Sequence, residues 1–255
     1  MITLKTITTI ELSNICNLEC RYCINRLIGP PERVRGIMSE QTFNLSLVWL
    51  KILCDRGTQK EVNLNGNGES CLDMNLPERV RRVKDIMGKG MVILGTNGVN
   101  MTLELMKDLK KAGLDKLDLS PHSVYHVRRT IMMMREIDMP GGLNFGPMTK
   151  SHNWAGQLEK ENCIEINFSI PCTPLIEGRG YIQKEGKVSP CCYDYRNLGV
   201  FGDVRDEHLL EMPIRPYSLC EECHQEIPEE IWNQERSFHE DHHDQFDRSQ
   251  FAVQS

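Results

Sequence analysis

The chain has 255 residues, of which 40% are hydrophobic and 26% charged, and its formal net charge is −6. This composition is typical of a globular protein with one or two domains, and no apolar run approaches the roughly 18 residues needed to span a bilayer. The acidic balance argues against nucleic-acid binding, which usually needs a basic face. Short basic clusters at 26/33/35, 81/82/84 and 128/129 are interpreted as solvated helix faces.

The eleven cysteines are the most informative part of the composition. Residues 1–10 contain no apolar signal-peptide core, so we expect a soluble, cytoplasmic protein in which disulfides are rare. Cysteines in such a chain indicate metal binding or catalysis.

Strand-like and helix-like segments alternate over the first 120 residues, which predicts an α/β fold built from βα units. Caps at Ser39 and Thr102 support two of the expected helices. The expected strands are 6–12, 61–65, 91–94 and 116–120, and the expected helices are 41–54, 76–87 and 103–113.

The pattern after residue 124 is less regular. Residues 131–134, Ile-Met-Met-Met, are predicted to be a buried helix segment, because methionine fills irregular apolar gaps. Residues 141–145 are predicted to form a turn and a short strand. The polar loop 151–156 contains His152, Asn153 and Trp154, which either contact a substrate or anchor a surface loop.

Three cysteines follow the first expected strand in the spacing C-x3-C-x2-C: Cys16, Cys20 and Cys23. A short loop with this spacing can direct three thiolates at three corners of a four-iron cluster, which leaves the fourth iron open. A structural zinc site would need a fourth nitrogen or sulfur ligand, and none flanks the loop closely. The spacing therefore favours an iron–sulfur cluster with one free coordination site.

This motif, with Tyr22 before its third cysteine, resembles that of the radical S-adenosylmethionine (SAM) superfamily. The resemblance implies a four-iron, four-sulfur (4Fe–4S) cluster whose open iron is chelated by SAM. It implies reductive cleavage of SAM to a 5'-deoxyadenosyl radical, which removes a hydrogen atom from a small-molecule substrate. It also implies a partial (β/α)6 TIM-like barrel, and an electron donor such as flavodoxin or ferredoxin.

Polar motifs stand where the expected strands end, and ligands of parallel βα proteins gather at that edge. Gly68 and Glu69 resemble the family's Gly-Glu motif, which receives the SAM ammonium, although Ser70 stands where proline often follows. The other cofactor contacts that the resemblance implies are Tyr22 near the adenine and Thr96, Asn97 and Ser120 near the ribose and carboxylate.

A second set of cysteines lies in the last third of the chain. Segments 178–183 and 187–189 are strand-like around the turn 184–186, which predicts a β-hairpin. The pattern resembles the SPASM and twitch extensions of radical SAM enzymes, which hold an auxiliary 4Fe–4S cluster. Four thiolates suffice for one such cluster, as in the shorter twitch type, and they equally suit zinc. The expected ligands are Cys172, Cys191, Cys220 and Cys223, with Cys192 as an alternative to Cys191.

These features predict three parts: a radical SAM partial barrel at 1–160, a twitch domain of hairpin and helix at 161–230, and an acidic, flexible tail at 231–255. The outline resembles the aminoglycoside-pathway radical dehydrogenases, which implies oxidation of a polar small molecule with the auxiliary cluster as electron acceptor. The alternatives are a radical epimerase or isomerase acting on a sugar, nucleotide or modified base, a peptide-modifying maturase, and a non-catalytic metal-cluster protein. The little chain before Cys16 leaves no room for a leader-binding domain and disfavours the maturase.

Three further residues are candidates for a catalytic role. Cys71 and Cys192 could each supply a hydrogen atom to a substrate radical, as a cysteine does in some radical epimerases. His122, just after the fourth expected strand, is either a cleft residue or a hydrogen-bonded loop histidine. Cys54 and Cys163 are expected to be buried as small apolar side chains.

Overall fold

The computed structural model describes residues 1–27, 33–120, 122–143, 154–155, 157, 170–223 and 225–233. His152, Asn153, Cys163 and residues 234–255 of the expected tail lie outside this range.

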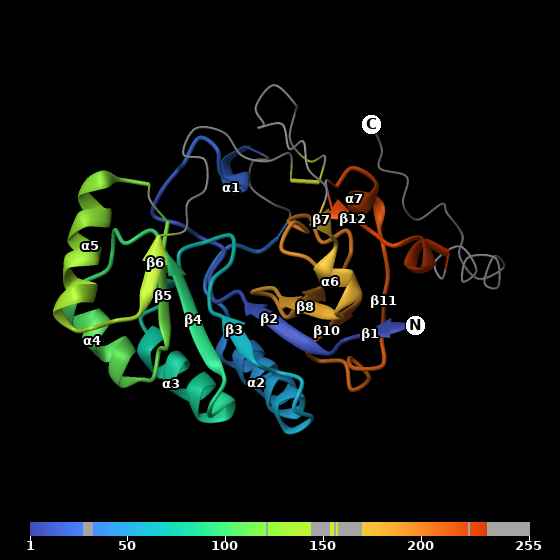
Figure 1. Ribbon diagram of the computed structural model, residues 1–255, viewed down its shortest axis with the longest axis horizontal. Helices are drawn as coiled ribbons and strands as arrows, with labels where there is room; N and C mark the ends of the chain where they lie inside the picture. The colour runs from blue at the N-terminus through green and yellow to red at the C-terminus, as the bar shows by residue number, and fades with distance from the viewer. Residues whose placement is uncertain are drawn as a thin grey trace.

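Within the described residues, one eight-stranded mixed sheet carries the fold, in the order β10-β9-β8-β2-β3-β4-β5-β6 (Figure 1). The six strands from β8 to β6 run parallel to one another, whereas β9 runs antiparallel to β8, and β10 runs antiparallel to β9. The strands are β2 (Thr6–Ile10), β3 (Glu61–Asn63), β4 (Met91–Thr96), β5 (Lys116–Leu119), β6 (Gly141–Leu143), β8 (Arg179–Ile182), β9 (Lys187–Ser189) and β10 (Gly202–Asp203). Two small pairs lie beside this sheet: β1 (Ile2–Thr3) with β11 (Pro213–Ile214), and β7 (Ile170–Pro171) with β12 (Gln225–Glu226).

Helices connect the parallel strands and cover the outer side of the sheet (Figure 1). Ser39 and Thr102 cap α2 and α4 as the sequence predicts, since each side chain accepts a bond from a backbone N–H in the first turn. The helices are α1 (Ile24–Leu27), α2 (Glu40–Asp55), α3 (Leu76–Met87), α4 (Leu103–Lys111), α5 (Val124–Glu136), α6 (Thr173–Ile176) and α7 (Ser218–Glu221), with the 3-10 turn η1 (Ser70–Leu72).

The core lies between the sheet and these helices. Ile7, Val62 and Leu94 from neighbouring strands are fully buried, as are Phe43 and Leu50 of α2. The apolar residues of the expected helices recur at helical spacing, so one face of each packs on the sheet. The α/β fold and the order of its first elements are therefore confirmed.

Helix α5 differs from the expectation of a buried Ile-Met-Met-Met segment. The helix spans Val124–Glu136, and Met134 is buried whereas Met132 is 69% exposed. Four consecutive helical residues point around the full circumference, so they cannot all face the core. The prediction was right for Met134 and wrong for Met132.

The predicted C-terminal hairpin joins the barrel sheet. Strand β8 pairs in parallel with β2, with Thr6 opposite Arg179 and Ile10 opposite Ile182, and β9 returns beside it. Gly186 occupies the turn with a φ of +97°, a conformation that glycine adopts without strain. Strands from the predicted barrel and twitch segments thus share one sheet, and the division at residue 160 stays a prediction.

None of the helices in the described part of the chain is long and apolar enough to cross a membrane.

The stability of the sheet is expected to depend on Leu94, which is fully buried in the central strand β4. Leu94→Ala should lower the free energy of unfolding by about 2–5 kcal/mol, because it leaves a cavity that the surrounding side chains cannot fill completely. Met91→Ala in the same strand should cost less than about 1 kcal/mol, since Met91 is 41% exposed. Urea denaturation of both variants measures the difference, and equal costs would contradict this packing.

Candidate active site

The three N-terminal cysteines lie on a loop that follows β2 and ends in the short helix α1. The Cys23 N–H donates to the Cys20 carbonyl at 3.0 Å, and the Arg26 N–H donates to the Cys23 carbonyl at 2.9 Å. Burial raises the pKa of the Cys16 and Cys23 thiols. The two thiols are therefore neutral without a metal, and binding a cation as thiolates would release their protons.

The loop after β3 packs directly on the cysteine loop, backbone against backbone. The Glu69 N–H donates to the Ile15 carbonyl at 2.8 Å. A Cβ atom at Gly68 would stand 2.4 Å from the Ile15 oxygen and 2.6 Å from the Ser13 oxygen, which is closer than such atoms approach. Only glycine permits this contact, so Gly68 sets how near Glu69 comes to the cysteines.

The Glu69 side chain is buried and held at both oxygens. Its Oε1 accepts from the Thr96 hydroxyl at 2.8 Å and from the Cys71 N–H at 3.1 Å. Its Oε2 accepts from the Asn97 N–H at 2.8 Å. Thr96 is the last residue of β4 and Asn97 follows it, so the edge of the sheet fixes the carboxylate in one orientation.

Asn97 also connects this carboxylate to the cysteine loop. Its side-chain amide donates to the Asn17 amide oxygen at 2.8 Å and contacts the Cys16 sulfur at 3.7 Å. The structure thus brings together Cys16, Glu69, Thr96 and Asn97, which the sequence predicted from separate motifs.

Ser120, His122 and Tyr22 border the same edge. The Ser120 N–H donates to the Thr96 carbonyl at 2.9 Å, which continues the edge from β4 to β5. The His122 ring stacks on Tyr22 with centroids 5.7 Å apart, and its Nδ1 hydrogen-bonds the Tyr22 hydroxyl. Burial lowers the pKa of His122 and raises that of Tyr22 to about 12, so both rings are neutral near pH 7. Beside Tyr22, His122 can fix the orientation of that ring.

The two candidate hydrogen donors lie in different surroundings. The Cys71 sulfur is 3.4 Å from the Thr96 hydroxyl beside Glu69, and burial raises the pKa of its thiol well above the usual range. Cys71 also packs against the hydrophobic core. Cys192 is exposed and adjoins the C-terminal cysteine site.

The four C-terminal cysteines surround one cavity. Cys172, Cys191, Cys220 and Cys223 all line it, although they come from separate segments around α6, β9 and α7. Its remaining walls are largely apolar or aromatic, and Cys192 is not among the lining residues. Burial raises the pKa of the Cys172 thiol, and that of Cys220 to about 12.

The arrangement and the type of the donor atoms decide which metal group these side chains could hold. No three or more His, Cys, Asp or Glu side chains in the described part of the chain are arranged to hold a metal ion directly. The donors of the C-terminal set are soft sulfur atoms around a cavity, a set that iron–sulfur clusters and zinc both accept. The four C-terminal cysteines therefore match a sulfur-ligated group in the kind of donor that they offer.

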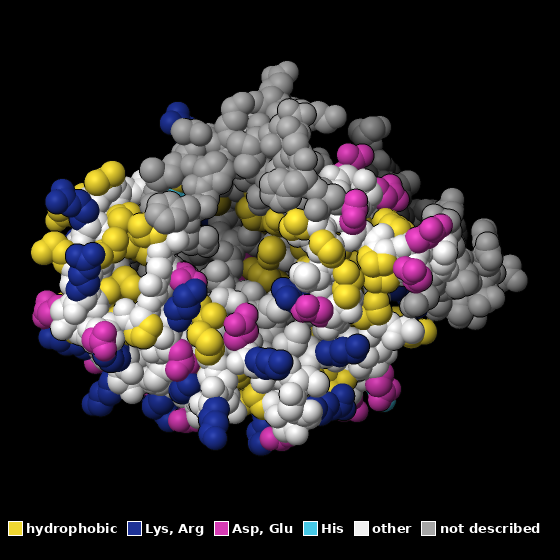
Figure 2. Space-filling view, in the orientation of Figure 1, with side chains coloured by type: hydrophobic (Ala, Val, Ile, Leu, Met, Phe, Trp, Pro, Cys, Tyr) yellow, Lys and Arg dark blue, Asp and Glu magenta, His cyan; other side chains and the backbone are white. Residues whose placement is uncertain are grey.

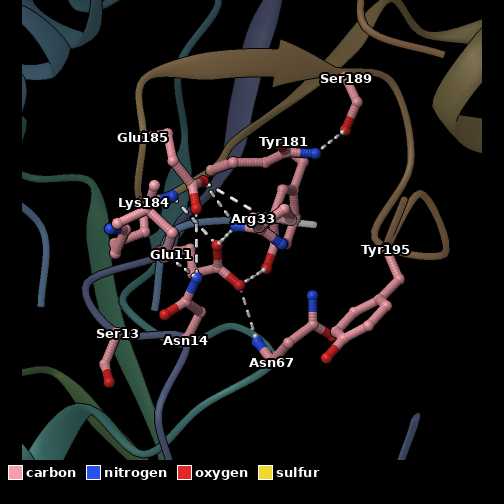
Figure 3. A network of polar contacts seen from close by, with 12 residues as sticks. Glu11, Ser13, Asn14, Arg33, Asn67, Tyr181, Lys184, Glu185, Ser189 and Tyr195 are labelled. Atoms are coloured by element: carbon pink, nitrogen blue, oxygen red, sulfur yellow. Dashed lines mark hydrogen bonds and ion pairs between the residues drawn. The ribbon is translucent and has the colours of Figure 1, made fainter. Parts of the chain in front are cut away.

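The sequence missed a buried polar network beside the cysteine loop (Figure 3). Arg33, interpreted as part of a solvated basic cluster, is only 6% exposed and forms ion pairs with Glu11 and Glu185. Arg81, by contrast, is exposed, as expected of a solvated helix face. The one signal for the network was an acid, Glu11, directly after an alternating strand.

Comparison with known proteins agrees with this geometry. The model of the Radical SAM superfamily matches residues 10–139, which is half of the chain and includes the cysteine loop and the ends of β2–β5. The chain therefore belongs to the radical SAM superfamily. This membership implies a 4Fe–4S cluster and SAM as cofactors.

Two curated relatives are both GTP 3',8-cyclases. The protein of Aquifex aeolicus (strain VF5) is 30% identical over 132 residues, which are 51% of this chain and 39% of that protein. The protein of Lactiplantibacillus plantarum (strain ATCC BAA-793 / NCIMB 8826 / WCFS1) is 32% identical over 111 residues, 44% of this chain and 32% of that protein. The matches thus span less than half of each relative.

Two solved structures share the fold over more of the chain. BtrN, in complex with AdoMet and 2-DOIA, has a TM-score of 0.65 and 20% identity, covering 81% of this chain and 80% of BtrN. The enzyme anSMEcpe with bound AdoMet has a TM-score of 0.56 and 14% identity, covering 79% of this chain and 75% of that one. The fold is thus that of these radical SAM partial barrels, with the large mixed sheet described above.

The backbone contact at Gly68 gives a direct test of the site. Gly68→Ala should push residues 13–15 away, lower the iron retained after anaerobic reconstitution, and destabilise the fold by about 1–3 kcal/mol. Gly142→Ala is the matched control, because its Cβ would meet nothing within 4 Å. Iron analysis and urea denaturation measure both effects. Equal iron content and equal stability in the two variants would contradict the close packing.

Proposed function

We propose that this protein cleaves SAM reductively to a 5'-deoxyadenosyl radical and removes a hydrogen atom from a polar small molecule. The observation that carries the proposal is the meeting of Cys16, Glu69, Thr96 and Asn97 at one edge of the parallel sheet. Cysteine sulfurs and a fixed carboxylate at that edge suit a cluster and a SAM ammonium side by side.

Different residues would hold the cluster and SAM. Cys16, Cys20 and Cys23 would hold the catalytic cluster. Glu69 would receive the SAM ammonium, and its three hydrogen bonds keep it from turning away. The remaining cofactor contacts would come from Tyr22, Gly68, Thr96, Asn97 and Ser120, with His122 supporting Tyr22.

A second cluster in a twitch-type C-terminal region is the second part of the proposal. Its support is the shared cavity of Cys172, Cys191, Cys220 and Cys223. Because Cys191 lines the cavity and Cys192 does not, the geometry favours Cys191 as the ligand. The match to BtrN covers 81% of this chain, which extends the likeness beyond the barrel.

Dehydrogenation is the reaction that best uses two clusters. Loss of a hydrogen atom and then of one electron and one proton converts a carbinol to a ketone. When bound, the clusters would supply one-electron chemistry, reductive cleavage of SAM at the first and acceptance of the substrate's second electron at the other. An external electron donor such as flavodoxin or ferredoxin would reduce the first.

A radical rearrangement of a nucleotide is the second candidate. It is favoured by one observation, the identity to proteins named GTP 3',8-cyclase over residues that include the cysteine motif. The likeness covers only 39% of the Aquifex protein, so it does not extend to the whole of that protein's activity.

Metal analysis tests the two clusters. Anaerobically reconstituted protein should contain about eight irons per chain, since each 4Fe–4S cluster contributes four. Cys220→Ala and Cys20→Ala should each reduce the content to about four, whereas Cys54→Ala, outside both sites, should not change it. About four irons together with stoichiometric zinc in the wild type would assign zinc to the C-terminal site and refute the auxiliary cluster.

Product analysis tests the chemistry. With dithionite and SAM, the wild type should release 5'-deoxyadenosine and Cys20→Ala should not. Aminocyclitols should stimulate this release if the protein is a dehydrogenase, and GTP should do so if the second candidate is right. No cleavage by the wild type with any of these would favour a non-catalytic protein.

Deuterium separates dehydrogenation from epimerisation. Dehydrogenation in heavy water should leave the reacting carbon without a carbon-bound deuterium, and Cys71→Ala or Cys192→Ala should not change the yield. Incorporation of deuterium that is lost in one of these variants would instead identify a radical epimerase with that cysteine as hydrogen donor.

A further inference from the structure

The backbone of Asn67, directly before Gly68 and Glu69, is hydrogen-bonded at both its N–H and its carbonyl. Its N–H donates to the Glu11 Oε1 at 3.0 Å, and its carbonyl accepts from the side-chain amide of Asn25. The two bonds restrain the peptide units on either side of the Asn67 Cα atom, two residues before the carboxylate proposed to receive SAM. The position of Glu69 therefore depends on Glu11 and Asn25.

Glu11 is fully buried and uses both oxygens (Figure 3). Besides Asn67, its Oε1 accepts from the Tyr181 hydroxyl at 3.1 Å. Its Oε2 accepts from the Arg33 guanidinium and from the Lys184 N–H at 3.0 Å. Tyr181 lies in β8 and Lys184 just after it, so the C-terminal hairpin fixes where this carboxylate points.

Asn25 is connected to the C-terminal region in the same way. It lies two residues after Cys23, and its Oδ1 accepts from the hydroxyl of Tyr195, which is fully buried. A hydroxyl that donates to Oδ1 leaves the amide NH₂ facing the Asn67 carbonyl. Without that hydroxyl, the Asn25 amide would lose one of these two bonds and would be held less firmly against the Asn67 carbonyl. Tyr195 lies four residues after Cys191, so the bond also joins the two cysteine regions.

We propose that Tyr181 and Tyr195 are positioning residues for SAM. They act through Glu11 and Asn25, which bind the backbone N–H and the backbone carbonyl of Asn67. The C-terminal region would thereby help to position the cofactor through the residues that it holds in place. The expected effect on SAM binding rests on the proposed function. The expected effect of the tyrosines on the backbone of Asn67 and Glu69 does not depend on it.

Tyr195→Phe and Tyr181→Phe test the proposal in the reconstituted holoprotein. Each removes one buried hydroxyl, and the amides of Asn67 and Glu69 should exchange hydrogen about three- to tenfold faster, the size expected for one hydrogen bond. The SAM dissociation constant, measured calorimetrically, should rise by a similar factor of about three to ten. Asn25→Ala should produce the same pattern.

Ser46→Ala is the matched control. Ser46 is fully buried in α2 and its hydroxyl donates to the Thr42 carbonyl at 2.9 Å, so its loss should lower stability without affecting the backbone of Asn67. Exchange at Asn67 and Glu69 should stay at the wild-type rate in this variant. A general loss of stability would accelerate both amides in the control as well, and that result would overturn the proposal.

The outcomes separate this inference from the proposed function. If the wild type binds and cleaves SAM but the tyrosine variants keep the wild-type rates of amide exchange and the wild-type affinity for SAM, the positioning role of the tyrosines is refuted and the proposed function stands. If the wild type does not bind SAM, the proposed function fails and the SAM role of the tyrosines fails with it. Faster amide exchange at Asn67 and Glu69 and weaker SAM binding in both tyrosine variants, with unchanged exchange in Ser46→Ala, would establish the positioning role of the two tyrosines.

Discussion

The arrangement of the site depends on one buried carboxylate, that of Glu11. A fully buried carboxylate is costly unless donors satisfy it, and removing the charged partner of a buried ion pair, here Arg33, costs about 3–5 kcal/mol. Its donors come from Arg33, Asn67, Tyr181 and Lys184. Because all four must reach it at once, the loop after β3 and the C-terminal hairpin have one permitted placement relative to the end of β2.

The parallel sheet places the candidate site residues at one edge. The parallel strands β2–β5 end at one edge, so the residues that follow each of them meet there. The cysteine loop follows β2, Glu69 follows β3, Thr96 ends β4, and Ser120 follows β5. Gly68 then allows direct backbone contact between the first two loops. The shared edge therefore brings together side chains that are far apart in the sequence.

The sequence predicted the parts of the site that have local signals. The spacing of Cys16, Cys20 and Cys23, and polar residues directly after apolar strands, can be recognised within a few residues. Glu11 has no comparable signal, because its donors lie 22, 56, 170 and 173 residues away along the chain. Arg33 was misread for the same reason, since its ion pair with Glu185 joins residues 152 apart. Packing across the sheet decides such contacts.

The position of β8 explains why the two cysteine sets are connected. A β-hairpin that merely carried the second set could attach anywhere on the barrel, but β8 pairs in parallel with β2, the strand that leads into the first set. The turn after β8 then reaches Glu11 through the Lys184 N–H, and Tyr195, after the cysteines that follow β9, reaches Asn25 beside Cys23. A change in the C-terminal region therefore has a short, buried route to the cofactor edge. Buried hydrogen bonds thus couple the C-terminal cysteine region to the loop that carries Cys16, Cys20 and Cys23.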